Sequence, residues 1–241
     1  MHRYFTIIAA RKNSKGIKGK NLQVIGNKPL LQYTIEAALI SKILDYTILS
    51  TDDTKAIKLA NRLGLKVPFV RPKSISQEDS TQSDVISHAL TWYKQKYKQY
   101  PDQVVLLQPT TPFRDHKDID DAIIKFEQLP CASLISVCEP SQHPCDFVFI
   151  NENGKLERVS LGDNENEVGR QGYKNVFFIN GGIYISTVER FIRKKFMFDE
   201  NSSIHIMNKS HSLDIDYPFD LEVARAIYSY NLNNDKDIFS L

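Results

Sequence analysis

The chain has 241 residues, of which 41% are hydrophobic and 25% charged, and its formal net charge is +2. These values are those of an ordinary globular protein that can bury one full core, and the near-neutral charge argues against a nucleic-acid-binding module. No apolar run is long enough to span a bilayer and no signal-peptide pattern opens the sequence, so we expect a cytoplasmic protein without a membrane partner.

The first loop concentrates positive charge. It follows an apolar run at residues 4–9, which predicts a buried strand, and it precedes a helix that we expect to begin at Pro29-Leu30-Leu31. Arg11–Lys20 contains five Lys or Arg residues and two glycines, and the first acidic residue of the chain is Glu36. Backbone N–H groups at glycines, together with Lys and Arg side chains, suit a polyphosphate. The spacing is not that of a Walker A loop, so a polyphosphate site and a solvated basic loop remain the two interpretations.

Apolar strands and amphipathic helices alternate through the first half of the chain. Predicted strands lead into polar stretches such as Thr51-Asp52-Asp53 and Gln108–Pro112. This alternation predicts βαβ units and an α/β fold with a mainly parallel sheet, in which ligands bind at the carboxyl ends of the strands. The predicted strands are residues 46–50, 67–70, 103–107 and 132–137, and the predicted helices are residues 30–39, 57–63, 85–97 and 118–129.

The predicted helix at residues 85–97 interleaves aromatic and basic side chains. Trp92, Tyr93 and Tyr97 stand among lysines. Such a mixture occurs in nucleic-acid-binding proteins, but it is also the pattern of an amphipathic helix with a solvated lysine face. The second interpretation is favoured, because the net charge of the chain is small.

The character of the sequence changes at Glu139. Two short alternating runs, residues 147–150 and 155–159, flank Asn151–Gly154, and this pattern predicts a β-hairpin. We therefore expect one core at residues 1–139 and 176–241, and an excursion from its sheet at residues 140–175.

Two aspartates stand near the end of the chain, in Leu213-Asp214-Ile215-Asp216. The alternation predicts a strand whose apolar residues point into the core and whose two carboxylates share the other face, about 6–7 Å apart. Mg²⁺ takes one or two carboxylates together with substrate phosphates. Asp214 and Asp216 are therefore a candidate Mg²⁺ site, with a pair of solvated acids as the alternative.

Taken together, these blocks resemble the acylneuraminate cytidylyltransferases, the CMP-sialic acid synthetases and their relatives for similar nine-carbon sugars. The resemblance covers nearly the whole chain, with the blocks in the family's order. It implies a three-layer α/β/α Rossmann-like nucleotidyltransferase fold, and a homodimer formed through the excursion. The resembling segments are Arg11-x-x-Ser14-Lys15-Gly16-Ile17-x-x-Lys20-Asn21, Ser50-Thr51-Asp52, Arg71-Pro72, Leu106–Arg114, Arg170-Gln171, Asn180–Tyr184 and Leu213–Asp216.

The resemblance also implies a role for each site residue. The catalytic residues would be Arg11, Lys20 and Asp216, of which the two cations neutralise charge on the leaving pyrophosphate. The sugar would be placed by Gln108, Arg170 and Tyr184, and Mg²⁺ by Asp214 and Asp216. The nucleotide, which the resemblance makes CTP, would be bound by Arg11, Ser14, Lys15, Gly16, Lys20, Asn21, Arg71 and Ser83.

The implied reaction is transfer of CMP from CTP to the anomeric hydroxyl of N-acetylneuraminic acid, with release of pyrophosphate. Family members often carry a lysine after His-Pro, where this chain has Cys145 and Asp146, so legionaminic and pseudaminic acids remain open as acceptors. Two other classes stay open as well. One is a metal-dependent glycosyltransferase that uses Asp214-x-Asp216, which would leave the basic loop unexplained. The other is a non-enzymatic nucleotide- or RNA-binding module.

Overall fold

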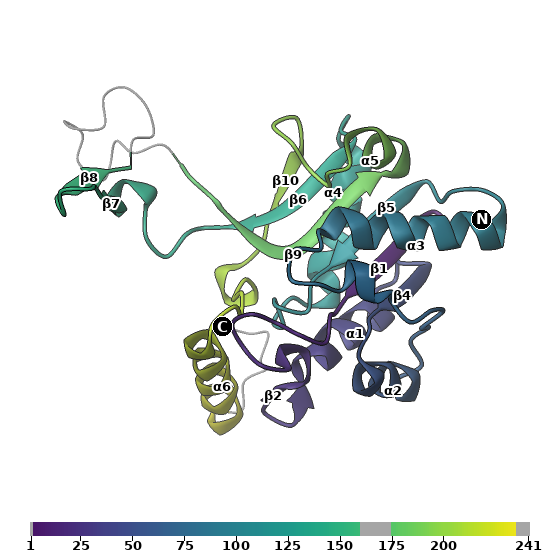
Figure 1. The fold of residues 1–241 in the computed structure, drawn as a ribbon, viewed down its shortest axis with the longest axis horizontal. Coiled ribbons are helices and arrows are strands. Elements are labelled where there is room, and N and C mark those ends of the chain that lie inside the picture. The colour runs from purple at the N-terminus through teal and green to yellow at the C-terminus, as the bar shows by residue number, and fades with distance from the viewer. Residues whose placement is uncertain (1, 160–174, 235–241) are drawn as a thin grey trace.

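A computed structural model describes residues 2–159 and 175–234 of the chain. Its centre is a six-stranded sheet in the order β10-β6-β9-β5-β1-β4, drawn in Figure 1. The strands are β1 (Tyr4–Ala9), β4 (Tyr46–Ser50), β5 (Gln103–Leu107), β6 (Ser133–Cys138), β9 (Phe178–Thr187) and β10 (Ser203–Ile206).

The sheet is mostly parallel, as predicted. Strand β1 pairs in parallel with β4 and with β5, and β10 pairs in parallel with β6. Only β9, among these six strands, runs antiparallel, between β5 and β6. Strands β1 and β5 are buried along almost their whole length, because helices cover both faces of the sheet.

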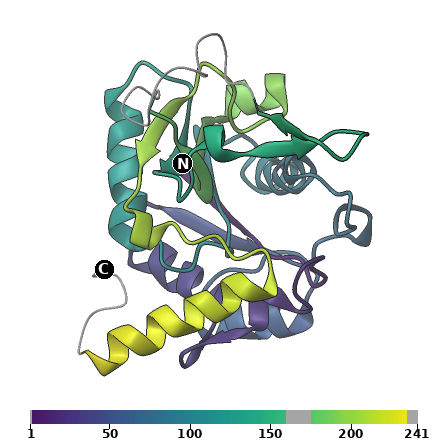
Figure 2. The same ribbon diagram turned by 90° about the vertical axis from the view of Figure 1, so that its left-hand side faces the viewer.

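Helices form a layer on each side of the sheet, which confirms the α/β fold. On one face pack α1 (Leu30–Ile40), α2 (Thr54–Arg62) and α4 (His116–Gln128), and on the other pack α3 (Gln82–Tyr97) and α5 (Val188–Lys194). Figure 2 shows α4 and α3 on opposite sides of the sheet. A third apolar cluster joins α6 (Pro218–Asn233) to the basic loop through Ile17 and Ile215.

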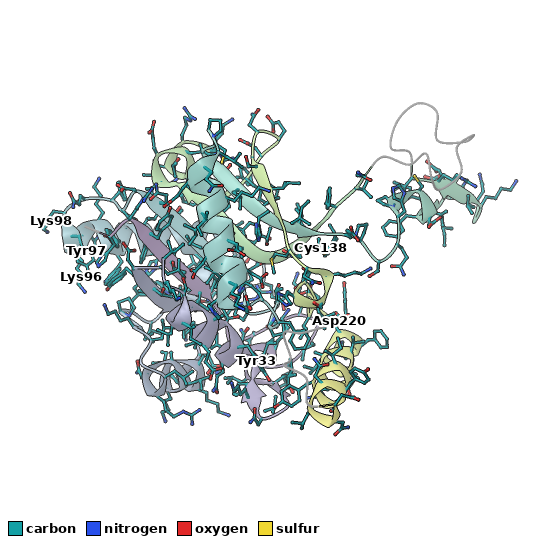
Figure 3. The ribbon with its side chains drawn as sticks, turned by 180° about the vertical axis from the view of Figure 1, so that it is seen from behind. Tyr33, Lys96, Tyr97, Lys98, Cys138 and Asp220 are labelled. Carbon is teal, nitrogen blue, oxygen red and sulfur yellow. The ribbon has the colours of Figure 1, made fainter. Side chains whose placement is uncertain are left out.

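The predicted helix at residues 57–63 is α2, and Gly64 follows it with φ +82°. The aromatic residues of α3 pack inward, and its lysines face outward: Lys96 Nζ lies 5.1 Å from the centre of the Trp92 ring. Figure 3 places Lys96, Tyr97 and Lys98 together at the end of this helix. The arrangement is that of an amphipathic helix with a solvated lysine face, as favoured from the sequence.

Helices α2 and α4 begin three and two residues earlier than predicted, and three further differences concern residues 67–70, the start of α3 and the aspartate segment. Residues 67–70 form no strand, since only Lys66 makes an isolated bridge to β4 and Pro68 has no N–H to donate. Helix α3 begins at Gln82 rather than Val85, with Thr81 as its N-cap. The segment that carries the two aspartates is not a strand either. The segment still buries its middle residue: the Ile215 N–H donates to Thr110 O (2.8 Å) and the Ile215 side chain is buried.

A β-hairpin arm leaves the sheet after β6. Strands β7 (Val148–Ile150) and β8 (Leu156–Arg158) pair antiparallel, and the turn between them is closed by Gly154 N donating to Asn151 O (2.9 Å). The predicted hairpin is therefore confirmed, and Figure 1 shows it standing apart from the main sheet. Two short strands that were not predicted from the sequence, β2 (Val24–Ile25) and β3 (Lys28–Pro29), pair beside α6. No helix in the described parts of the chain is both long and apolar enough to cross a bilayer.

Candidate active site

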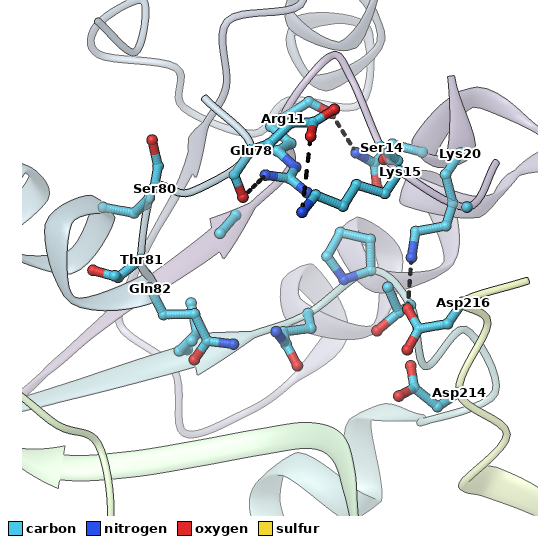
Figure 4. A pocket seen from close by; sticks show the side chains of 18 of the residues that line it. Arg11, Ser14, Lys15, Lys20, Glu78, Ser80, Thr81, Gln82, Asp214 and Asp216 are labelled. Atoms are coloured by element: carbon cyan, nitrogen blue, oxygen red, sulfur yellow. Dashed lines mark hydrogen bonds and ion pairs between the residues drawn. The ribbon is translucent and has the colours of Figure 1, made fainter. Parts of the chain in front are cut away.

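A cavity of about 530 Å³ lies at the carboxyl ends of β1 and β5. Because these strands are parallel neighbours, the segments that leave them meet at one edge of the sheet. The basic loop after β1 forms one wall, and residues 108–110 after β5 form the floor. The segment of Asp214 and Asp216 and a loop before α3 complete the lining, as Figure 4 shows.

The basic loop brings all six of its predicted nucleotide ligands to this cavity. The residues of the loop that line it are Arg11, Ser14, Lys15, Gly16, Lys20 and Asn21. Asn21 is buried, and its side-chain amide donates to Arg11 O (2.9 Å), which holds the two ends of the loop together. The Lys12 N–H donates to Asp52 Oδ1 (2.7 Å), so the loop is also tied to the end of β4.

The loop meets the aspartate segment directly. A β-carbon on Gly16 would collide with Asp216 O, so no larger residue fits this approach. The Lys20 ammonium donates to Asp216 Oδ1 (2.9 Å) and to Ile215 O (2.8 Å). Figure 4 shows this pair at one end of the cavity. The structure thus joins the predicted polyphosphate loop to the predicted metal ligands.

Asp214 and Asp216 differ in environment. Asp216 is exposed, whereas Asp214 is half-buried and its buried Oδ1 has no hydrogen-bond partner among the described residues. Burial raises the pKa of Asp214 to about 6, against a hydrogen bond from the Thr110 side chain that lowers it. A buried carboxylate oxygen without a donor, next to a second carboxylate, fits a hard divalent cation. These two residues therefore suit Mg²⁺.

A loop of residues 77–82 forms the wall opposite the aspartates. Arg11 Nη1 donates to Gln77 O (2.9 Å) and to Glu78 O (3.2 Å), and Lys15 Nζ lies 3.8 Å from the Glu78 carboxylate. In Figure 4 these contacts reach across from the basic loop to Glu78. Arg11 and Lys15 are therefore held by backbone carbonyls and a carboxylate of this loop. A bound polyphosphate would compete with these groups for the two cations.

Arg71 and the start of α3 line the part of the cavity away from Asp216. The Arg71 side chain is buried and donates to Ser50 O (2.6 Å), and burial lowers its pKa to about 10. Ser80, Thr81 and Gln82 line the cavity here, whereas the predicted ligand Ser83 lies in the first turn of α3 and is not part of the lining. The start of this helix could have identified these residues, but the prediction placed it at Val85, three residues too late.

The predicted sugar ligands are distributed unevenly. Gln108 lines the cavity. Tyr184 is buried in β9, outside the lining, where it stacks on Phe198 with ring centres 6.0 Å apart, and burial raises its pKa to about 12. Arg170 lies outside the described residues.

Two buried residues that sequence reasoning did not single out support the floor of the site. The Asn180 side chain accepts from Ser136 Oγ (2.6 Å) and donates to Ser212 Oγ (2.9 Å), which links β6, β9 and the aspartate segment. The Arg114 guanidinium donates to Gln108 O (3.2 Å) and Gly182 O (2.8 Å). Burial lowers the pKa of Arg114 to about 10, while the charges of Asp118 and Asp115 favour its charged form. Both residues lie within the resembling segments, but neither has a spacing that marks it.

Comparisons with known proteins identify the family. The sequence profile of the family described as Cytidylyltransferase matches residues 5–165. The chain is 33% identical over 227 residues to a pseudaminic acid cytidylyltransferase of Campylobacter jejuni, covering 93% of this chain and 96% of that protein. It is 30% identical over 233 residues to an N-acylneuraminate cytidylyltransferase of Escherichia coli O18:K1:H7, covering 97% of this chain and 54% of that protein.

The fold has a close counterpart among solved structures. A CMP:2-keto-3-deoxy-manno-octonic acid synthetase complexed with CTP superposes with a TM-score of 0.69 at 17% identity. The match covers 95% of this chain and 99% of that one. At this identity the likeness shows a shared fold.

Proposed function

The chain belongs to the cytidylyltransferase family that includes the N-acylneuraminate cytidylyltransferases, and we propose that it transfers CMP from CTP to the anomeric hydroxyl of an acidic nine-carbon sugar, releasing pyrophosphate. Family membership sets aside the metal-dependent glycosyltransferase and the non-enzymatic nucleotide- or RNA-binding module. We also infer a cytoplasmic location from the sequence.

The observation that carries this proposal is the junction of the basic loop with the aspartate pair in one cavity. Nucleotidyl transfer needs alignment of the reacting groups and stabilisation of developing negative charge, without a covalent nucleophile. Within the basic loop, Lys20 contacts Asp216 and Arg11 contacts the backbone at Gln77 and Glu78. Both cations line the cavity, and in the proposed reaction they would hold the triphosphate and neutralise the departing pyrophosphate.

The base would lie toward Arg71 and the start of α3, away from Asp216. The lining there offers hydroxyl and amide groups from Ser80, Thr81 and Gln82, which can serve both the donor and the acceptor atoms of cytosine. Ser83 and Asn21 remain predicted base ligands, and in this structure the Asn21 amide holds Arg11 O.

Asp214 and Asp216 would hold Mg²⁺ against the phosphates. Bound there, the cation would neutralise phosphate oxygens and lower the pKa of the attacking anomeric hydroxyl. Lys20 has a second task in this arrangement. Its bond to Asp216 Oδ1 orients that carboxylate before substrate arrives.

The acceptor that we favour is N-acetylneuraminic acid, because the Leu106–Thr110 block and Arg170-Gln171 resemble the sialic acid branch of the family. Gln108, Tyr184 and Arg170 would place the sugar, with the guanidinium of Arg170 matching its carboxylate. Pseudaminic acid is the second candidate. It is supported by the relative of that activity and by Cys145-Asp146, which stand where a lysine is common.

We further propose a homodimer formed through the arm. The side chains of β7 and β8 that face solvent in the single chain include Phe149, Ile150 and Leu156. An exposed apolar ribbon of this kind is typical of a protein–protein interface.

Pyrophosphate release tests the reaction and the acceptor together. The enzyme is incubated with CTP and Mg²⁺, and N-acetylneuraminic, legionaminic, pseudaminic and 3-deoxy-octulosonic acids are offered in parallel. Release with one nine-carbon acid supports the proposal and identifies the acceptor, and mass spectrometry of the CMP-sugar confirms the bond. Release with none of the nine-carbon acids, from a protein that still binds CTP, would refute the acceptor class.

A further inference from the structure

Arg114 is among the largest side chains that are fully buried in the described structure. It leaves the turn after β5, and its guanidinium makes its hydrogen bonds with the backbone: Nη1 donates to Gln108 O (3.2 Å) and to Gly182 O (2.8 Å). Its Nε and Nη2 atoms have no hydrogen-bond partner among residues 2–159 and 175–234. Burying a guanidinium costs free energy. The fold accepts this cost here because the guanidinium joins two backbone carbonyls, those of Gln108 and Gly182.

These two carbonyls lie at the point where β5 and β9 separate. The antiparallel register of the two strands ends with Leu107 opposite Ile183. The next residues in the same register would be Gln108 and Gly182, the two residues whose carbonyl oxygens Arg114 joins. Beyond this fork Gln108 enters the cavity, and Gly181 adopts φ +70°. Arg114 therefore replaces the strand-to-strand pairing with a side-chain bridge.

The fork sets the position of the cavity floor. A β-carbon on Gly181 would lie 2.8 Å from Gln108 Oε1 and 3.8 Å from Asp214 Oδ2. Gly181 thus lies against both the predicted sugar ligand and one predicted metal ligand. The basic loop, in contrast, is held by Asp52, Asp216 and the loop at residues 77–78. A shift at the fork should accordingly move Gln108 and leave the triphosphate wall in place.

Acidic groups compensate the charge of Arg114. Asp115 and Asp118 act on it electrostatically, and each of these two carboxylates accepts from the other's backbone N–H at the start of α4. Asp118 also contacts His211 (2.8 Å), three residues before Asp214. The buried cation is therefore part of a network that reaches the aspartate segment.

From this geometry we propose that Arg114 is a positioning residue for the acceptor sugar, acting by holding Gln108 and the Gly181-Gly182 stretch of β9 at the fork. This inference rests on the proposed function. Arg114 does not line the cavity, so its effect on the reaction passes through Gln108.

The test compares Arg114→Lys with a matched control, Arg190→Lys. Arg190 is likewise buried and donates to a backbone carbonyl, Phe196 O (2.7 Å), but it lies in α5, away from the cavity lining. For Arg114→Lys we expect KM for the acceptor to rise at least about tenfold, with the Kd for CTP within about twofold of wild type. For Arg190→Lys we expect neither constant to change, whatever the loss of Tm. Unchanged acceptor KM in Arg114→Lys, or an equal rise in both variants, would overturn the inference.

A second variant keeps the test valid if Arg114→Lys folds poorly. Gly181→Ala displaces Gln108 from the other side of the fork, and we expect the same pattern of raised acceptor KM and unchanged CTP affinity. Hydrogen exchange gives a readout that needs no turnover. The amides of residues 108, 110, 111 and 180–183 should exchange faster in Arg114→Lys than in Arg190→Lys or wild type. Silence of the wild type with every acid would refute the proposed acceptor, whereas equal exchange at the fork would refute the role of Arg114.

Discussion

Gly16 and Asp216, which are 200 positions apart in the chain, are in backbone contact: a β-carbon on Gly16 would collide with the carbonyl oxygen of Asp216. The absence of a side chain lets the basic loop pack against the aspartate segment, and Lys20 then reaches Asp216 Oδ1. The contact explains why the polyphosphate wall and the metal ligands share one cavity.

We predict that Gly16→Ala lowers kcat roughly 10- to 100-fold, because the loop must shift by a fraction of an ångström to an ångström away from Asp216. Circular dichroism and Tm should remain close to wild type. Gly19→Asn is the control in the same loop: the residue has φ +61° with open space around it, and asparagine tolerates that conformation. Equal activity of Gly16→Ala and wild type would show that the contact is not needed.

Asp216→Asn separates binding from turnover. The amide keeps the shape of the carboxylate but lacks the charge that Mg²⁺ requires. We expect CTP affinity, measured by calorimetry, to stay within a few-fold of wild type, and turnover in the pyrophosphate assay to fall about 100-fold or more. Glu222→Gln, an exposed acid of α6 paired with Arg225, should behave as wild type. Near-normal turnover of Asp216→Asn would remove Asp216 from the metal site.

Local pattern was sufficient to predict most of the fold. Strand β1, helix α1 and the arm hairpin follow from apolar periodicity and turn residues within a few positions. The strand predicted at residues 67–70 was wrong, because an apolar run with a proline can pack against a sheet without joining its hydrogen-bond ladder. The antiparallel direction of β9 could not be predicted either, since it depends on where the chain returns after the arm.

The candidate site was predicted to the extent that its residues lie in short recognisable blocks. The basic loop, Arg71, Gln108 and the aspartate pair all line one cavity. Gln82 was missed because the helix start was placed at Val85, and Glu78 was missed because it lies in a polar loop without a distinguishing pattern. Arg114 was missed because its partners are backbone carbonyls of β5 and β9, which no sequence spacing reveals.

The buried carboxyl of Asp214 predicts a pH dependence of stability in the metal-free protein. Its pKa is raised from 3.8 to about 6 by burial, so the folded state binds this proton more tightly than the unfolded chain does. The contribution to stability is present below about pH 4 and is lost as the pH rises through about 6. Asp214→Asn cannot ionise, so its Tm in EDTA should gain on that of wild type as the pH rises over this range. Parallel pH profiles of the two proteins would contradict the assignment.

Glu78 faces the basic loop, and its carboxylate competes with the phosphates of CTP for Lys15. Its carboxylate lies 3.8 Å from Lys15 Nζ, and both side chains are exposed. We predict that Glu78→Gln lowers the Kd for CTP about two- to fivefold, the range expected for an exposed ion pair, with the gain shrinking at high salt. Asp79→Asn, next in the loop but outside the cavity lining, is the control. A weaker affinity in Glu78→Gln would mean that Glu78 supports the nucleotide instead.

The arm provides the test of the dimer. Ile150 in β7 is 81% exposed in the single chain, which is unfavourable unless another surface covers it. Sedimentation equilibrium should show a dimer for the wild type and a shift to monomer for Ile150→Arg, since an interface cannot easily bury an unpaired guanidinium. Ile40→Arg, a similarly exposed position at the end of α1, should leave the dimer intact. The same mass for Ile150→Arg and wild type, whether monomer or dimer, would exclude the arm as the interface.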